Sequence, residues 1–249
     1  MSWSQRISVS DWPATIQSVA GTVIVAIFAV TFVVQAFTIP SESMEKTLLI
    51  GDYLLVDKFC YGESGFWNLI LPYRKIRRGD IVVFHYPVNP SQHFVKRVVA
   101  LPGDRLRLIN KQVYINGAPL AEPYVQYIAS DREPYRDDFP RTDAAVPDVT
   151  AGWWREMRTL VEDRQLIIPE GNYFVLGDNR DDSKDSRYWG FVPRESIIGR
   201  PLLIYWSASN LNNDLPTSPT VGDRLYHLAY AITHVFQITR WERTFRRVK

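Results

Sequence analysis

Two serine side chains, Ser41 and Ser43, lie one residue apart near the start of the segment TIPSESMEKTLLIGDYLLVDK, residues 38–58. The segment follows directly on a long apolar stretch. A serine hydroxyl attacks a carbonyl carbon when a base removes its proton and hydrogen-bond donors stabilise the oxyanion that forms. A serine just beyond the end of a membrane helix is therefore a candidate nucleophile for a membrane-linked substrate.

The base that such a serine needs is usually a histidine, and two histidines come first into consideration. His85 lies inside the apolar run 80–86, and His93 lies beside a turn rich in proline and serine. Each position is more typical of a structural or surface histidine than of a catalytic one.

A lysine is the alternative base, provided that it loses its proton near neutral pH. Lowering a lysine pKa by about two to three units costs roughly 3 to 4 kcal/mol, and burial against apolar neighbours achieves it. Lys96, in the apolar run 94–101, fits this requirement. Because side chains alternate along a strand, Lys96 and Arg97 face opposite ways, and the pattern leaves open which face is the core. A solvated lysine on an edge strand is the alternative interpretation.

Lys46 follows Ser43 by three residues and gives an SxxK pattern. In penicillin-binding proteins and class A β-lactamases this pattern comes with later SDN and KTG elements. The chain has neither element in usable form, and the neighbours of Lys46 offer nothing to desolvate it. We therefore favour Lys96 over Lys46 as the base.

The acidic stretch 178–187 could suggest a calcium loop. An EF-hand loop that starts at Asp178 would need glycine at the sixth position, where the chain has Ser183. Arg180 would occupy a ligand position. The alternation of acidic and basic residues instead predicts a network of ion pairs and turn caps. Because Cys60 is the single cysteine and no Cys/His cluster occurs, we expect no zinc, no other metal and no cofactor.

The composition favours a folded protein with a sizeable core. Of 249 residues, 46% are hydrophobic and 13% aromatic, and the formal net charge is +2. No basic stripe interleaves with aromatic residues, so nucleic acid is not expected as a partner. The length favours one large domain or a main domain with a smaller one embedded in it.

Short apolar runs bounded by turn residues predict a mainly β fold. The expected strands are residues 52–58, 80–86, 94–101, 105–109, 112–115, 165–169, 172–176 and 197–206. Asn116-Gly117 is the preferred dipeptide of a type I′ hairpin. Residues 122–164 differ in composition and read as an inserted subdomain or long loop, with a helix around 153–161.

The segment before Ser41 is uncharged from Trp12 onward. About 20 apolar residues in a helix span a hydrocarbon core of about 30 Å, so we expect a transmembrane helix over 15–37. A cleavable signal peptide ending near Ala36 is the alternative. Arg6 and the terminal amine against Asp11 give a weak charge bias toward a cytoplasmic N-terminus.

The tail places apolar residues on one helical face and ends in a cluster of arginines. A basic amphipathic helix on an anionic bilayer and a segment that packs back on the β body are equally good interpretations. The predicted organisation is an N-terminus over residues 1–14, a membrane helix over 15–37, a β domain over 38–121 and 165–206, an insertion over 122–164, a linker over 207–223 and the amphipathic helix over 224–249.

Three motifs in a fixed order carry a resemblance to a known family. They are PSESM with TL and GD in residues 40–52, KRVVALPGD in 96–104, and GDNRDDSKDSRYWGFVP in 177–193. Together they resemble the bacterial type I signal peptidases. The resemblance implies a membrane-bound serine endopeptidase with a Ser/Lys dyad on a mostly β catalytic domain.

Carried over by position, the resemblance makes Ser43 the nucleophile and Lys96 the general base. Ser41 and the Ser43 backbone N–H would stabilise the oxyanion, and Ser183 would orient the lysine. Asp185 and Arg187 would form a supporting ion pair. The substrate pocket would be formed by Ile39, Pro40, Met44, Leu48 and Val95.

The sequence also departs from the family pattern. Glu42 stands where many members have glycine, and Lys46 where many have proline. Both change the surroundings of the nucleophile without removing a catalytic group. Some members carry two N-terminal spans, whereas one is predicted here.

The function implied is removal of signal peptides from exported preproteins after a small-residue A-x-A-like motif. The expected partners are these preproteins and the lipid bilayer. The expected location is the bacterial cytoplasmic (inner) membrane, crossed once, with the catalytic domain on the outer side. A catalytically silent β scaffold that binds export partners is the alternative. A self-cleaving Ser/Lys protease is a third, although it would bring a DNA-binding domain and no membrane span.

Overall fold

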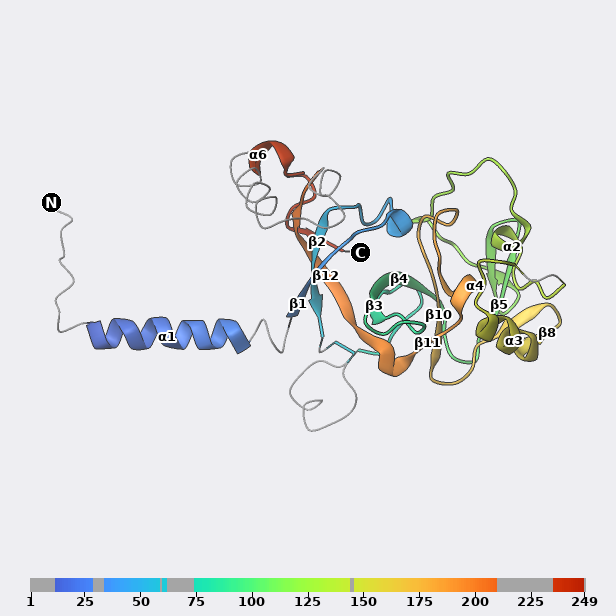
Figure 1. Ribbon diagram of the computed structural model, residues 1–249, viewed down its shortest axis with the longest axis horizontal. Helices are drawn as coiled ribbons and strands as arrows, with labels where there is room; N and C mark the ends of the chain where they lie inside the picture. The colour runs from blue at the N-terminus through green and yellow to red at the C-terminus, as the bar shows by residue number, and fades with distance from the viewer. Residues whose placement is uncertain are drawn as a thin grey trace.

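Two antiparallel β-sheets form the body of the protein (Figure 1). The computed structural model describes residues 12–28, 34–58, 60–61, 74–143, 146–209 and 235–248. The first sheet has the strand order β1-β2-β12-β3-β4-β10-β11, with β13 also paired to β12. Its strands are β1 (Val34–Thr38), β2 (Asp52–Asp57), β3 (Ile81–His85), β4 (His93–Ala100), β10 (Asn172–Leu176), β11 (Val192–Pro193), β12 (Ile197–Ser207) and β13 (Arg246–Arg247).

The second sheet has the order β7-β6-β5-β9-β8. Its strands are β5 (Arg105–Ile109), β6 (Gln112–Ile115), β7 (Ala118–Pro119), β8 (Val161–Glu162) and β9 (Gln165–Ile167). All the predicted strands are present, so the mainly β prediction is confirmed. Asn116 and Gly117 have φ values of +53° and +83°, the left-handed values that a type I′ turn requires.

β3 is buried on both of its faces, which is why its residues are apolar at consecutive positions. Ile81 and Val83 pack in one core cluster, with Leu54 and Val56 of β2. Phe84, on the opposite face, packs in another core cluster. Because side chains alternate across a strand, a strand covered on both faces needs apolar residues at every position.

The insertion packs against the second sheet rather than standing apart. Its described part contains the short helix α2 (Pro134–Asp137) and α3 (Ala151–Leu160), which matches the helix predicted around 153–161. Trp153 and Met157 of α3 are buried in one cluster with residues of β5, β6 and β9. The strands of the second sheet lie on both sides of the predicted boundaries of the insertion, and the division into domains stays a prediction.

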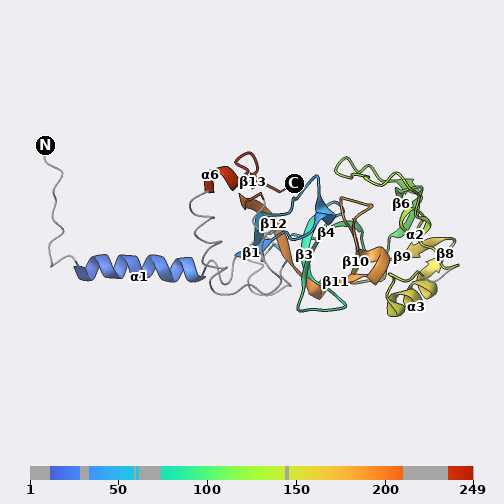
Figure 2. The ribbon, with the colours of Figure 1, turned by 45° about the horizontal axis from the view of Figure 1, so that its top comes forward.

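The N-terminal part differs from the predicted helix over 15–37. Helix α1 (Trp12–Phe28) is followed by β1, whose residues pair with β2 from Val34↔Asp57 to Thr38↔Tyr53. The prediction is therefore wrong at its C-terminal end, because residues 34–37 form a strand paired with β2. Within the described residues, no helix is both long and apolar enough to cross a membrane. Figures 1 and 2 show α1 standing apart from both sheets.

The C-terminal part also differs from its prediction. Residues 210–234, which include most of the predicted linker, lie outside the described residues. Within 235–248, the expected continuous helix is wrong, because α6 (Val235–Ile238) is short and β13 pairs with β12 (Figure 2). The buried side chains of Arg243 and Val248 hold this segment to the sheet. Packing back on the β body is thus what these residues do.

Candidate active site

Ser43 lies in the connection between β1 and β2, which we call the serine loop (residues 39–51). A single turn of 3-10 helix, Glu42–Met44, carries Ser43, whose side chain is largely buried. The Gly51 N–H donates to the Ile39 carbonyl at 3.0 Å and closes the loop. Gly51 has φ +83°, and a Cβ there would lie 2.1 Å from the Ala208 carbonyl oxygen, so glycine is required.

Lys96 reaches this loop from the middle of β4. Its Nζ lies 2.5 Å from Ser43 Oγ and donates a hydrogen bond to it. The side chain is only 4% exposed. Burial lowers the pKa of Lys96 from 10.5 to about 8, although the charges of Asp185 and Asp178 act in the opposite direction. A substantial neutral fraction therefore exists near pH 8, as a general base requires.

Both faces of β4 are covered at this point, which answers the question that the alternation of side chains left open. Lys96 faces Ser43, while Arg97 is equally buried on the other face. Arg97 binds Asp178 through two hydrogen bonds of 2.8 Å and 2.6 Å, and Asp178 accepts a third from Thr47 Oγ1 at 2.6 Å. This pair was not predicted from the sequence. Arg97 within an apolar strand was the available signal, because a buried arginine needs an acidic partner.

Ser41 stands at the mouth of the site. Its Oγ lies 3.3 Å from Ser43 Oγ, and its side chain is exposed. This places a second hydroxyl beside the candidate nucleophile, on the solvent side. A hydroxyl in this position can turn its proton toward an oxygen that develops negative charge next to Ser43.

A pocket of about 560 Å³ opens beside Ser43 and Lys96. Four predicted pocket residues line it: Ile39, Pro40, Met44 and Val95. Leu48 does not; it is fully buried in the core cluster that also contains Met44. The structure adds Phe37 and Phe94 to the lining, neither of which had been predicted.

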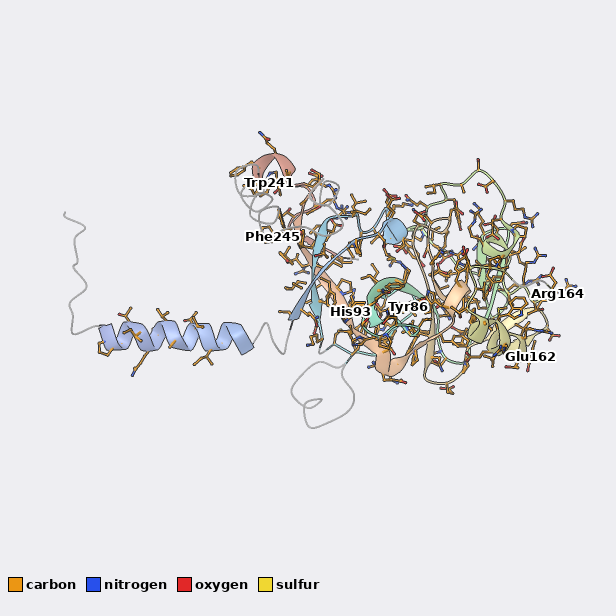
Figure 3. All side chains as sticks on the ribbon, viewed as in Figure 1. Tyr86, His93, Glu162, Arg164, Trp241 and Phe245 are labelled. Carbon is orange, nitrogen blue, oxygen red and sulfur yellow. The ribbon has the colours of Figure 1, made fainter. Side chains whose placement is uncertain are left out.

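The two histidines do not reach the serine. His85 Nδ1 lies 2.9 Å from the Pro90 carbonyl oxygen, and His93 lies at the edge of the pocket against Phe37, with ring centroids 5.4 Å apart. Figure 3 shows His93 on the sheet beside Tyr86. Burial, together with the neighbouring His85, lowers the pKa of His93.

Lys46 points away from Ser43. Its Nζ donates to the carbonyl oxygens of Pro123 and Val125, each at 2.9 Å. Its backbone has φ +80°, in the left-handed region, two residues beyond the end of the 3-10 turn. The SxxK alternative therefore lacks the contact between serine and lysine that it requires.

Ser183 approaches the site from the segment after β10. A Cβ on Gly177 would lie 2.3 Å from Ser183 Oγ and 2.4 Å from the Ser43 carbonyl oxygen, so Gly177 separates Ser183 from the serine loop by the smallest possible residue. Within the described residues, the buried Ser183 hydroxyl has no hydrogen-bond partner. The hydroxyl lies close enough to Asp185 to help lower the pKa of that carboxyl.

Asp185 and Arg187 form a fully buried pair next to Gly177. Arg187 donates to both Asp185 oxygens at 2.8 Å, and the Gly177 N–H donates to Oδ2 at 3.1 Å. Burial alone would raise the pKa of Asp185, but the charge and hydrogen bonds of Arg187 outweigh it and the pKa is lowered. The pair fixes the backbone of Gly177 and hence the position of Ser183.

Three of the four aspartates of this segment bind basic side chains. Asp181 accepts from Lys111 at 2.8 Å, and Asp178 and Asp185 pair with arginines as described above. Over the described ranges, no group of three or more histidine, cysteine or acidic side chains is arranged to hold a metal ion.

Comparison with known proteins gives one consistent result. Residues 12–206 match the family model described as "Signal peptidase, peptidase S26". Signal peptidase I of Pseudomonas aeruginosa is 37% identical over 217 residues, covering 77% of this chain and 72% of that protein. Signal peptidase I of Aquifex aeolicus is 35% identical over 216 residues, covering 74% of this chain and 80% of that protein. Signal peptidase I of Leptolyngbya laminosa is 36% identical, covering 79% of this chain and 80% of that protein.

Proposed function

The chain belongs to the signal peptidase family, peptidase S26, and from this premise we propose that Ser43 and Lys96 are the catalytic pair with which it removes signal peptides. The protein is a serine endopeptidase that acts on preproteins. The observation that carries the assignment of the pair is the 2.5 Å contact between Lys96 Nζ and Ser43 Oγ beside an open pocket. A silent scaffold would have no need to bury a lysine against a serine.

Lys96 moves one proton at each chemical step. In its neutral form it takes the Ser43 proton as Oγ attacks the scissile carbonyl carbon. It then gives that proton to the leaving amine, and an ester to Ser43 remains. Water attacks the ester after losing a proton to Lys96, and Ser43 regains its proton when the product acid leaves.

The oxyanion formed at each attack is stabilised by the Ser41 hydroxyl and the Ser43 backbone N–H. The 3.3 Å separation of the two hydroxyl oxygens supports this role for Ser41. Ser183 aligns the Lys96 amine, and the buried pair of Asp185 and Arg187 holds Ser183 in place through Gly177. The position of the Ser183 hydroxyl directly across Gly177 from the Ser43 carbonyl supports this role.

The substrate binds as an extended strand between β1 and β4. β1 is at the edge of its sheet, and β10 pairs with β4 at residues 97–100, beyond Lys96. Backbone hydrogen bonds to these edges would position the scissile bond over Ser43. The apolar lining by Ile39, Met44 and Val95 suits the small side chains of an A-x-A-like motif, while Leu48 supports the pocket from the core.

The segment that contains α1 anchors the protein in the cytoplasmic membrane, with the catalytic sheets on the outer side. Large apolar side chains of α1 are exposed; Val19, Ile24 and Val25 are 58%, 66% and 67% exposed. Lipid would cover these side chains favourably. The anchor would keep Ser43 next to the bilayer, where the signal segment of a preprotein lies.

Substitution of Ser43 tests the catalytic assignment. We expect Ser43→Ala to abolish cleavage of a preprotein by the full-length chain in detergent, because no attacking oxygen remains. Lys46→Ala is the matched control, since it removes a nearby lysine that points away, and it should keep most of the activity. Wild-type cleavage by Ser43→Ala would contradict the proposal.

A further inference from the structure

The last described residues of the chain pack against the serine loop, although no catalytic step uses them. We call residues 235–248 the C-terminal strap. Its β13 pairs with β12, Thr239 bridges to Ala208, and Val248 is buried in the same core cluster as Met44 and Leu48. The strap thus lies behind the loop that carries Ser43.

An ion pair joins the strap to the end of the serine loop. Arg243 donates to both oxygens of Asp52, from Nε at 3.1 Å and from a terminal nitrogen at 2.5 Å. The same arginine donates to the Thr47 carbonyl at 3.0 Å. Asp52 is completely buried and Arg243 is 7% exposed, so removal of either side chain would leave the other charge buried without its partner.

Further contacts make Asp52 the fixed point of the loop. Its carboxylate accepts the Leu49 N–H at 2.9 Å and the Ser207 hydroxyl at 2.7 Å. Arg240 of the strap donates to the Ile50 carbonyl at 3.0 Å. The second half of the serine loop is therefore held by polar groups of the strap and of β12.

Thr47 connects these contacts to the catalytic serine. Its carbonyl is held by Arg243, and its hydroxyl donates to Asp178 from the opposite side. The backbone N–H groups of Thr47 and Leu48 donate to the carbonyl of Met44, the residue directly after Ser43. A displacement of Thr47 would therefore be transmitted to the 3-10 turn and to Ser43 Oγ.

We propose that Arg243 is a positioning residue for Ser43, acting through Asp52 and Thr47. This inference rests on the proposed role of Ser43 as the nucleophile. Without the guanidinium, the buried Asp52 carboxylate loses its bidentate partner and the loop shifts to bring it water. The contact between Ser43 and Lys96 then lengthens, and a misplacement of about 1 Å can cost on the order of 100-fold in rate.

The experiment compares arginines on the same strap in the full-length chain. Arg243→Gln removes the buried charge, and Arg246→Gln is the matched control because Arg246 is exposed on β13. We expect Arg243→Gln to lower kcat for preprotein cleavage by about 10-fold or more, with KM changed by less than about 2-fold. Arg243→Lys should recover part of the rate, and Arg246→Gln should match the wild type.

The pH dependence of kcat separates positioning from a general loss of stability. A loosened loop admits water to Lys96, so its pKa rises and the rise of activity with pH moves to higher pH in Arg243→Gln. A variant that has a lower Tm but wild-type kcat and pH profile, measured well below that Tm, would overturn the inference. Full cleavage by Ser43→Ala in the same assay would instead overturn the proposed function on which it rests.

A second variant keeps the test open if Arg243→Gln does not fold. The double variant Asp52→Asn/Arg243→Gln removes both buried charges and so avoids an unpaired carboxylate. It still lacks the contact to the Thr47 carbonyl, so we expect a reduced kcat, with a loss smaller than the product of the two single losses. Wild-type kcat in this double variant would also overturn the inference.

Discussion

The two sheets use charge in opposite ways. Around the serine loop, the first sheet buries Lys96 together with the pairs Arg97–Asp178 and Arg187–Asp185. The second sheet has an apolar core, and its ion pair between Arg105 and Glu162 lies at the surface, where the side chains are 43% and 61% exposed. Figure 3 shows Glu162 at the end of the molecule far from α1. Buried charge, which normally costs stability, thus surrounds Lys96. The buried pair Arg136–Asp137 of α2, beside the second sheet, is an exception to this contrast.

The largest expected effect comes from Lys96→Met, which replaces the buried amine by an apolar side chain of similar length. Activity should fall by at least about 10⁴-fold because Ser43 loses its base. The free energy of unfolding should rise, because the folded state lowers the Lys96 pKa from 10.5 to about 8 and so disfavours its charged form. The gain should be about 3 kcal/mol below pH 8 and should vanish as the pH rises through 10.5.

Denaturant unfolding at several pH values measures this gain, with Lys46→Met as the control because Lys46 is exposed. If Lys96→Met lost stability as well as activity, burial of the lysine would not oppose folding. The claim that the first sheet buries charge at a cost in stability would then be wrong.

A cavity in the second sheet should have the opposite effect to Lys96→Met, with lower stability and unchanged activity. Leu106 of β5 is fully buried in the apolar cluster. Leu106→Ala should lower the free energy of unfolding by about 2 to 5 kcal/mol and leave kcat unchanged while the protein is folded. Urea unfolding and preprotein cleavage at low temperature check both halves of this prediction. A clear drop in kcat would mean that the second sheet also positions catalytic groups.

The smallest effect is expected at the surface of the second sheet. Arg105 and Glu162 approach to 3.2 Å in open solvent. Glu162→Gln should change the free energy of unfolding by less than about 1 kcal/mol and leave activity unaltered. A larger loss, measured by thermal unfolding at low and high salt, would show that charge matters equally in both sheets.

Local sequence signals predicted much of the fold and the principal contact of the site. The strands followed from short apolar runs between turns, and the three motifs predicted the contact between Ser43 and Lys96 that the structure shows. The end of the membrane prediction failed because Val34 and Phe37 are as apolar as a membrane helix, and only their pairing with β2 identifies them as strand residues.

Other features depend on partners that lie far away in the sequence. The sequence places Arg243 in the basic cluster at the end of the predicted helix, and only the fold shows that Asp52, almost two hundred residues earlier, lies beside it. Leu48 was assigned to the pocket but lies in the core, because its place depends on how deeply the serine loop is buried. The second sheet joins strands that precede the predicted insertion to strands within and after it. Composition had set the insertion apart from the β domain.

The pH dependence of kcat/KM for preprotein cleavage by the full-length chain tests the central claim, that burial makes Lys96 the base for Ser43. The reactive lysine is neutral, so activity should rise with pH through a pKa of about 8 and stay high above it. The same profile is expected for His93→Ala, since His93 only borders the pocket. A profile that is flat from pH 6 to pH 10, or a rise near pH 6.5 that disappears in His93→Ala, would contradict the claim.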